Sequence, residues 1–136
     1  MVPPQVVRDL AYSNGLAQIA IAGRGWFYRL RNGRMASVLT FDVGPDPFQE
    51  GLARQNIDGH IVYIDRHLNP RIVTRYDLAA PFDHGRADVC SGCRELAVEG
   101  DEHQIMAGGI WGVIDRRGDL VIPLAPRSGI GGLETV

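Results

Sequence analysis

A short segment of this 136-residue chain occurs three times, and this self-similarity restricts the fold more than any other feature of the sequence. The three segments read AYSNGLAQ at 11–18, PFQEGLAR at 47–54 and PFDHGRAD at 81–88. Their aromatic residues, Tyr12, Phe48 and Phe82, are 36 and 34 residues apart, and each is followed by glycine after three residues and by alanine after five. A period of this length predicts tandem units that bury an apolar face against each other.

Each segment is followed by a stretch that is typical of a β-hairpin, at 25–38, 60–73 and 110–123. Asp115, followed three residues later by Gly118, predicts a type I turn that ends in a glycine of positive φ. Gly112, beside Trp111, removes a side chain where a neighbouring strand or ring approaches closely. Outside PQVVRDLAY, at 4–12, no window of a dozen residues has a strong helical period. The sequence therefore predicts an all-β fold with about three strands per unit.

The third unit is longer than the other two by about 15 residues, which indicates an insert at about 90–107. We expect a single domain of three stacked units, arranged as a small solenoid-like or propeller-like array. Its predicted segments are unit 1 at about 11–47, unit 2 at about 48–81, unit 3 at about 82–124 and a flexible tail at 125–136.

Composition restricts the class of partner. Hydrophobic residues make up 45% of the chain and charged residues 22%, values that are typical of a globular domain. The net charge of −2 gives no general attraction to nucleic acid or to an anionic membrane. The N-terminus has no apolar stretch of signal-peptide length, and no segment is apolar for long enough to span a membrane. We therefore expect a cytoplasmic protein whose partner is another protein.

The segments FQEGLA, FDHGRA and WGVIDRRGDLVIP, with RYDLAAPF between units, resemble the WG (or KWG) repeat family of mainly bacterial proteins, over about residues 11–124. The resemblance implies a β-rich repeat structure that acts as a binding or scaffold module and has no shared catalytic site. The third unit matches best, whereas the second has Ile61-Val62 for the Trp-Gly pair and the first has Phe27 for its glycine. The resemblance implies structural roles for Trp26, Gly33, Phe48, Gly51, Phe82, Gly85, Trp111, Gly112, Asp115 and Gly118.

The insert contains the one local cluster of side chains that could bind a metal ion or carry out redox chemistry, Cys90-Ser91-Gly92-Cys93. Two thiolates at this spacing can bind one metal ion, and with His103 they would supply three ligands of a tetrahedral zinc site. A redox-active pair has the same spacing. The third interpretation is a pair of inert thiols, or a local disulfide, that braces the insert. The spacing alone leaves all three open.

Other polar residues give weaker signals. Asp42, Asp46 and Glu50 do not follow the spacing of a calcium loop, and the prolines between them indicate a corner between units. Arg66 and Arg116 occupy equivalent places, where they would form either a solvated edge or a contact patch for an acidic partner. The histidines fall in different units, so no spacing brings any two together: His60, His67, His84 and His103.

No phosphate-binding loop, nucleophile elbow or zinc-protease motif is present. The leading hypothesis is therefore a non-enzymatic repeat module for protein–protein interaction. The alternative is a zinc- or redox-responsive binding protein that uses Cys90 and Cys93. A third hypothesis, an enzyme with a site assembled from different units, would require a deep pocket with at least two convergent titratable groups.

Overall fold

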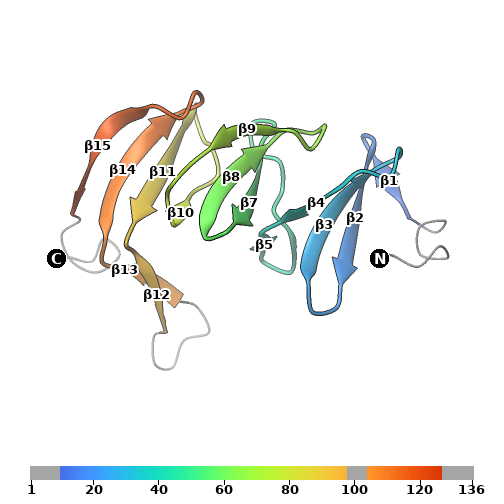
Figure 1. Ribbon diagram of the computed structural model, residues 1–136, viewed down its shortest axis with the longest axis horizontal. Helices are drawn as coiled ribbons and strands as arrows, with labels where there is room; N and C mark the ends of the chain where they lie inside the picture. The colour runs from blue at the N-terminus through green and yellow to red at the C-terminus, as the bar shows by residue number, and fades with distance from the viewer. Residues whose placement is uncertain (1–9, 98–103, 127–136) are drawn as a thin grey trace.

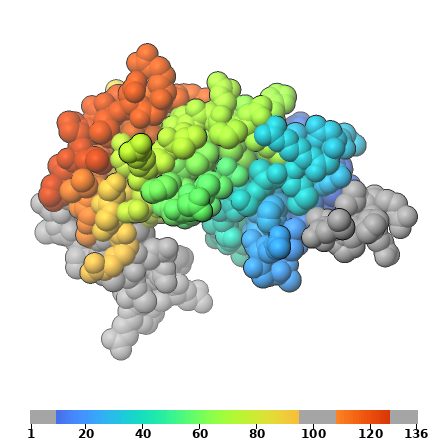
Figure 2. Space-filling view, viewed as in Figure 1, coloured from blue at the N-terminus to red at the C-terminus, as the bar shows by residue number. Residues whose placement is uncertain are grey.

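The computed structural model describes residues 10–97 and 104–126, and within these residues the chain is all-β, with several small antiparallel sheets and no helix. Three larger sheets follow one another in a row along the long axis of the molecule, in the order of the chain (Figure 1 and Figure 2). No helix within the described residues is long and apolar enough to cross a membrane.

The first sheet has the strand order β1-β2-β3-β4, and the second has the order β7-β8-β9. Neighbouring strands within each sheet are also consecutive in sequence, so each sheet is a simple meander. The strands of the first sheet are β1 (Tyr12–Ser13), β2 (Leu16–Ile21), β3 (Gly25–Leu30) and β4 (Met35–Val38). Those of the second are β7 (Ala53–Ile57), β8 (His60–Ile64) and β9 (Pro70–Val73).

The third sheet has the order β10-β11-β14-β15, and two strand pairs lie outside the larger sheets. The strands of the third sheet are β10 (Leu78–Ala79), β11 (Arg86–Ser91), β14 (Ile110–Asp115) and β15 (Leu120–Pro126). One small pair is in the connection between the first two sheets, β5 (Thr40–Phe41) with β6 (Gly44–Pro45). The other is in the predicted insert, β12 (Arg94–Ala97) with β13 (Gln104–Ala107).

The three predicted hairpins are confirmed as β3–β4, β8–β9 and β14–β15. Their turns share one pattern of backbone hydrogen bonds, in which the N–H groups of Leu30, Asp65 and Asp115 each donate to the carbonyl oxygen four residues further on. In the turns that begin at Asp65 and Asp115, the aspartate Oδ1 also accepts backbone N–H groups at 2.9–3.1 Å. These hydrogen bonds lower the pKa of Asp115, the largest cause being the N–H of Asp119. The two aspartates therefore act as turn-stabilising residues.

Two boundaries differ from the sequence prediction. Strand β15 continues through Pro126, so the first two residues of the expected tail belong to the sheet, and residues 127–136 lie outside the described chain. The insert was expected at about 90–107, but Cys90 and Ser91 still pair with β14, so the extra segment is 92–109. It forms the β12–β13 hairpin, which projects from the third sheet (Figure 1).

The second sheet is covered on both faces. The side chains of β8 alternate between two hydrophobic cores, with Val62 and Ile64 in one and Ile61 and Tyr63 in the other, and all four are buried. Complete burial of an aliphatic side chain contributes roughly 1.5–3 kcal/mol relative to its exposure. The neighbouring sheets therefore stabilise β8 from both sides, which explains why its sequence is a continuous apolar run.

Each core lies between two sheets, with residues from both. The first core, between the first and second sheets, consists of Leu16, Tyr28, Val38, Ala53, Val62, Ile64 and Leu68. The second core, between the second and third sheets, consists of Leu52, Ile61, Tyr63, Ile72, Ala79, Phe82, Ala87, Val89 and Ile114.

Gly112 lies where β14 and β15 approach closely, as the sequence predicts. A Cβ atom at this position would lie 2.7 Å from the carbonyl oxygen of Ile122 and 3.2 Å from side-chain carbons of Leu120 and Leu124. The pairing of β14 with β15 is irregular at this point. A backbone oxygen cannot move without disturbing that pairing, so only glycine fits here.

We predict that Gly112→Ala destabilises the protein by about 1–3 kcal/mol, because the added methyl group overpacks the interface between β14 and β15. The measurement is the free energy of unfolding from urea denaturation. Gly44→Ala is the matched control, since a Cβ atom there has no neighbour within 4 Å and its φ is not positive. Equal stabilities of the two variants would contradict this account of Gly112.

Candidate functional site

The first and second sheets are joined by an aromatic contact. Tyr28 of β3 packs against Phe48, in the connection that leads to β7, with ring centroids 4.9 Å apart. Its hydroxyl donates a hydrogen bond of 2.8 Å to the carbonyl oxygen of Asp46. Burial raises the pKa of Tyr28, with a further increase from the charge of Asp46, so the hydroxyl keeps its proton and remains a donor.

The second and third sheets are joined in the same way. Tyr63 of β8 packs against Phe82 with ring centroids 4.7 Å apart, and its hydroxyl donates to the carbonyl oxygen of Ala80 at 2.7 Å. We call each of these tyrosine–phenylalanine contacts, together with its hydrogen bond, a joint. In both joints the residue whose carbonyl oxygen accepts the hydrogen bond lies two positions before the phenylalanine. Each joint therefore fixes the connecting segment to the preceding sheet by a ring contact and a hydrogen bond.

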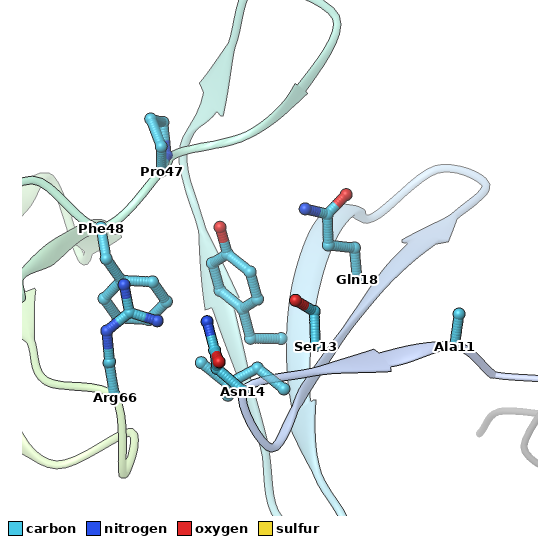
Figure 3. A pocket seen from close by; sticks show the side chains of 9 residues that line it. Ala11, Ser13, Asn14, Gln18, Pro47, Phe48 and Arg66 are labelled. Carbon is cyan, nitrogen blue, oxygen red and sulfur yellow. The ribbon is translucent and has the colours of Figure 1, made fainter.

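A groove of about 520 Å³ opens beside the first joint, between the first two sheets. Figure 3 shows Ser13, Asn14 and Gln18 on the side of the first sheet, and Phe48 and Arg66 on the opposite side. The three polar residues and Arg66 are exposed to solvent, whereas Tyr28, which also lines the groove, is buried. The groove thus combines an aromatic wall with amide and hydroxyl groups and one guanidinium.

Arginines lie over the aromatic residues that begin the three predicted units. The pairs are Arg31 over Tyr12, Arg66 over Phe48 and Arg116 over Phe82, with distances of 4.5, 4.9 and 5.8 Å from the guanidinium carbon to the ring centroid. Arg66 and Arg116 thus occupy equivalent places, as expected from the sequence. A guanidinium that stacks on an aromatic ring is held in place but keeps its positive charge. Its N–H groups lie around the plane of the guanidinium and can still donate hydrogen bonds.

Glu50 connects the turn before β7 to the third sheet. Its two carboxylate oxygens accept the backbone N–H of Gly85 at 3.1 and 3.2 Å. Arg116 donates to one of these oxygens at 3.3 Å and to the backbone carbonyl of Glu50 at 2.8 Å. A carboxylate is therefore held by one backbone N–H and one arginine at the corner between the second and third sheets.

Asp46, which the sequence assigned to a corner between units, forms a buried ion pair. Its side chain is 1% exposed and accepts from the Nη2 and Nε atoms of Arg54 at 2.6 and 3.1 Å, and from the backbone N–H of Arg54 at 2.8 Å. Arg54 Nη1 also donates to the carbonyl oxygen of Ala79 in β10, at 3.0 Å. The pair thus links the connection between the first two sheets with the third sheet.

Cys90 and Cys93 are joined by a disulfide at the base of the insert, with Cα atoms 6.1 Å apart. Cys90 is fully buried in β11, and Cys93 lies just before β12. The disulfide sulfurs are not thiolates, so zinc binding would require the reduced pair. Among the described residues no group of three His, Cys, Asp or Glu side chains could hold a metal ion, and the third predicted ligand, His103, lies outside them.

The structure separates the described histidines, which are all exposed: His60, His67 and His84. The two tryptophans are partly buried in different sheets. Trp26 packs against the first core, and Trp111 Nε1 donates to the carbonyl oxygen of Gly108 at 3.0 Å. The glycines expected as repeat markers lie in turns of positive φ, apart from Gly112: Gly33, Gly51, Gly85 and Gly118.

Sequence reasoning missed several residues of the joints and the groove. Tyr28 and Tyr63 are 35 residues apart, and each lies two positions before the residue that begins its hairpin turn, Leu30 or Asp65, so this signal was present in the sequence. Asn14 gave no such signal, because its place in the groove depends on how the two sheets meet. No family model, curated protein or solved structure matches this chain.

We predict that Asp46→Asn lowers the free energy of unfolding by about 3 kcal/mol or more at neutral pH, because it leaves the guanidinium of Arg54 buried without its carboxylate. Urea denaturation followed by tryptophan fluorescence measures the change. Asp119→Asn is the control, since Asp119 is 70% exposed and pairs with Arg117 only at 3.7 Å. A loss at Asp46 no greater than that at Asp119 would show that the ion pair does not stabilise the fold.

Proposed function

We propose that this chain is a non-enzymatic repeat module for protein–protein interaction. In this proposal its three sheets are tandem WG-type units, stacked as an array in which each joint fixes the next unit. The matching joints support this arrangement, since Tyr28 with Phe48 and Tyr63 with Phe82 make the same contacts one period apart. Stacked units offer a partner a broad surface of fixed shape.

The observation that carries the proposal is the groove between the first two sheets. Both sheets contribute to its wall, so its shape depends on the joint that fixes Phe48 against Tyr28. A partner that enters the groove therefore meets preorganised groups and loses less binding free energy to ordering of the module. Its polar lining and solvent exposure fit a loop of another protein.

A second candidate, a redox-responsive binding protein, is favoured by one observation. The disulfide between Cys90 and Cys93 lies where β11 leaves the third sheet and the insert begins. Reduction would release the link between the sheet and the first strand of the insert. In this second proposal the partner binds the insert, and binding depends on the oxidation state of the pair.

Affinity capture from a lysate tests the leading proposal. We expect the immobilised chain to retain a protein saturably, with equal yield in the presence of a chelator or a reductant. Gln18→Trp fills the groove and should lower retention at least about tenfold. Val43→Trp is the matched control, because Val43 is 91% exposed, lies away from the groove and should tolerate the same indole without effect.

Three other outcomes are distinguishable. Retention that is lost with reductant, and in a Cys90→Ser/Cys93→Ser variant, would replace the leading proposal by the redox-responsive one. Loss with chelator alone would point to zinc. Turnover of a substrate by the purified chain, abolished by one histidine substitution, would contradict a non-enzymatic role.

A further inference from the structure

The two corners between sheets are built from the same parts, with one difference. At the corner between the second and third sheets, the carboxylate of Glu50 is held by the backbone N–H of Gly85 and by Arg116. Arg116 lies over Phe82 and therefore approaches Glu50 from a fixed direction. The protein thus contains one complete carboxylate site, whose ligand is its own side chain.

The corner between the first and second sheets has the same donors. Arg66 lies over Phe48 as Arg116 lies over Phe82, and Gly51 occupies the same turn position as Gly85, with φ values of 81° and 77°. The turn residues before these glycines, Glu50 and His84, both have φ of 54°. Arg66 and Gly51 thus take the same places in their ring contact and turn as Arg116 and Gly85 take at the other corner.

The two corners differ in the side chain that faces the arginine, which is a carboxylate at one corner and an amide at the other. The position that corresponds to Glu50 in the preceding turn is Asn14, whose φ is also 54°. Its side chain is neutral and one methylene group shorter. Within residues 10–97 and 104–126, no carboxylate is bonded to Arg66, and the space beside Asn14 and Arg66 is part of the groove. The first corner therefore has an exposed guanidinium at the place of Arg116 and an amide at the place of the Glu50 carboxylate.

We propose that the groove binds a glutamate side chain of a partner protein, in the place that Glu50 occupies at the next corner. The carboxylate accepts hydrogen bonds from Arg66 and from the N–H of Gly51. The apolar stem of the glutamate lies against Phe48, and Ser13 and Gln18 face the partner's backbone across the groove. This inference rests on the proposed function, since it names the group by which the partner is recognised.

The donor set favours a carboxylate over a phosphate group. One guanidinium and one backbone N–H together bond both oxygens of a carboxylate at Glu50, where the N–H of Gly85 donates to both oxygens and Arg116 donates to one. A phosphate would bring a second negative charge, and Arg66 is the one cationic residue among those that line the groove. A glutamate on a turn of another protein fits both the charge and the shape of the site.

A peptide titration tests the site. The probe copies residues 48–52 (FQEGL) and is blocked at both ends, so that glutamate carries its only charge. We expect the amide resonance of Gly51 to shift on titration, with about tenfold weaker binding when the peptide carries glutamine in place of glutamate. Binding of the glutamate peptide should weaken with added salt. Sodium acetate is the third arm, and it represents a free carboxylate without a peptide.

Two substitutions at one position provide the matched variants. Asn14→Glu supplies the missing carboxylate within the chain, so it should raise the melting temperature and abolish the peptide-dependent shift of Gly51. Asn14→Gln has the same length and the same cost of positive φ, but no charge, so it should have neither effect. Arg66→Gln should lose peptide binding without loss of the fold, because Arg66 is exposed.

The site is overturned if both peptides shift Gly51 equally or if neither shifts it. A response to acetate as strong as that to the glutamate peptide would overturn the assignment to a protein side chain. Failure of this site remains distinct from failure of the proposed function. A captured partner that is retained equally by Arg66→Gln and Asn14→Glu leaves the interaction module in place and removes only the carboxylate site.

Discussion

The burial of β8 on both of its faces is the constraint on which the rest of this structure depends. A strand of five residues offers alternate side chains to two cores, and each core needs a sheet on its other side. The second sheet is therefore stable only between its neighbours. Hydrophobic burial alone does not fix the orientation of one sheet against the next. Tyr28 and Tyr63 do so, because the hydroxyl of each forms a directional hydrogen bond with the segment that leads into the next sheet. The row of sheets follows from these contacts without any helix in the described chain.

The contacts between the first and second sheets resemble those between the second and third, so the few residues that differ between the two corners can be compared directly. Glu50 accepts hydrogen bonds from the N–H of Gly85 and the guanidinium of Arg116, whereas the corresponding turn has the neutral Asn14, and the corresponding arginine, Arg66, lines the groove. A difference of one methylene group and one charge thus separates the turn of Glu50, which bonds to the third sheet, from the turn of Asn14, which lies beside the groove. The buried Asp46–Arg54 pair has the opposite role, since its charges are used within the fold.

The sequence predicted the local elements better than the contacts between them. The hairpins, the turns at Asp65 and Asp115 and the close approach at Gly112 depend on neighbouring residues, so their patterns are visible in the chain. The tyrosine joints were missed because Val113 takes the corresponding place in the third hairpin, the one with the clearest motif. The Asp46–Arg54 pair could not be predicted, since its carboxylate and guanidinium meet only when the connection before β7 lies back along that strand. The spacing of Cys90 and Cys93 allowed a disulfide but could not select it over two thiols.

Native-state hydrogen exchange measured over a range of denaturant concentrations tests the central claim, that contacts across the joints make the three sheets one cooperative structure. Amides of β3, β8 and β14 report on the three sheets separately. The account predicts that the slowest amides of all three strands exchange with one common free energy, equal to that of global unfolding. If the amides of β3 and β14 open at much lower free energies while those of β8 stay protected, the sheets are independent units, and the joints do not fix the groove between them.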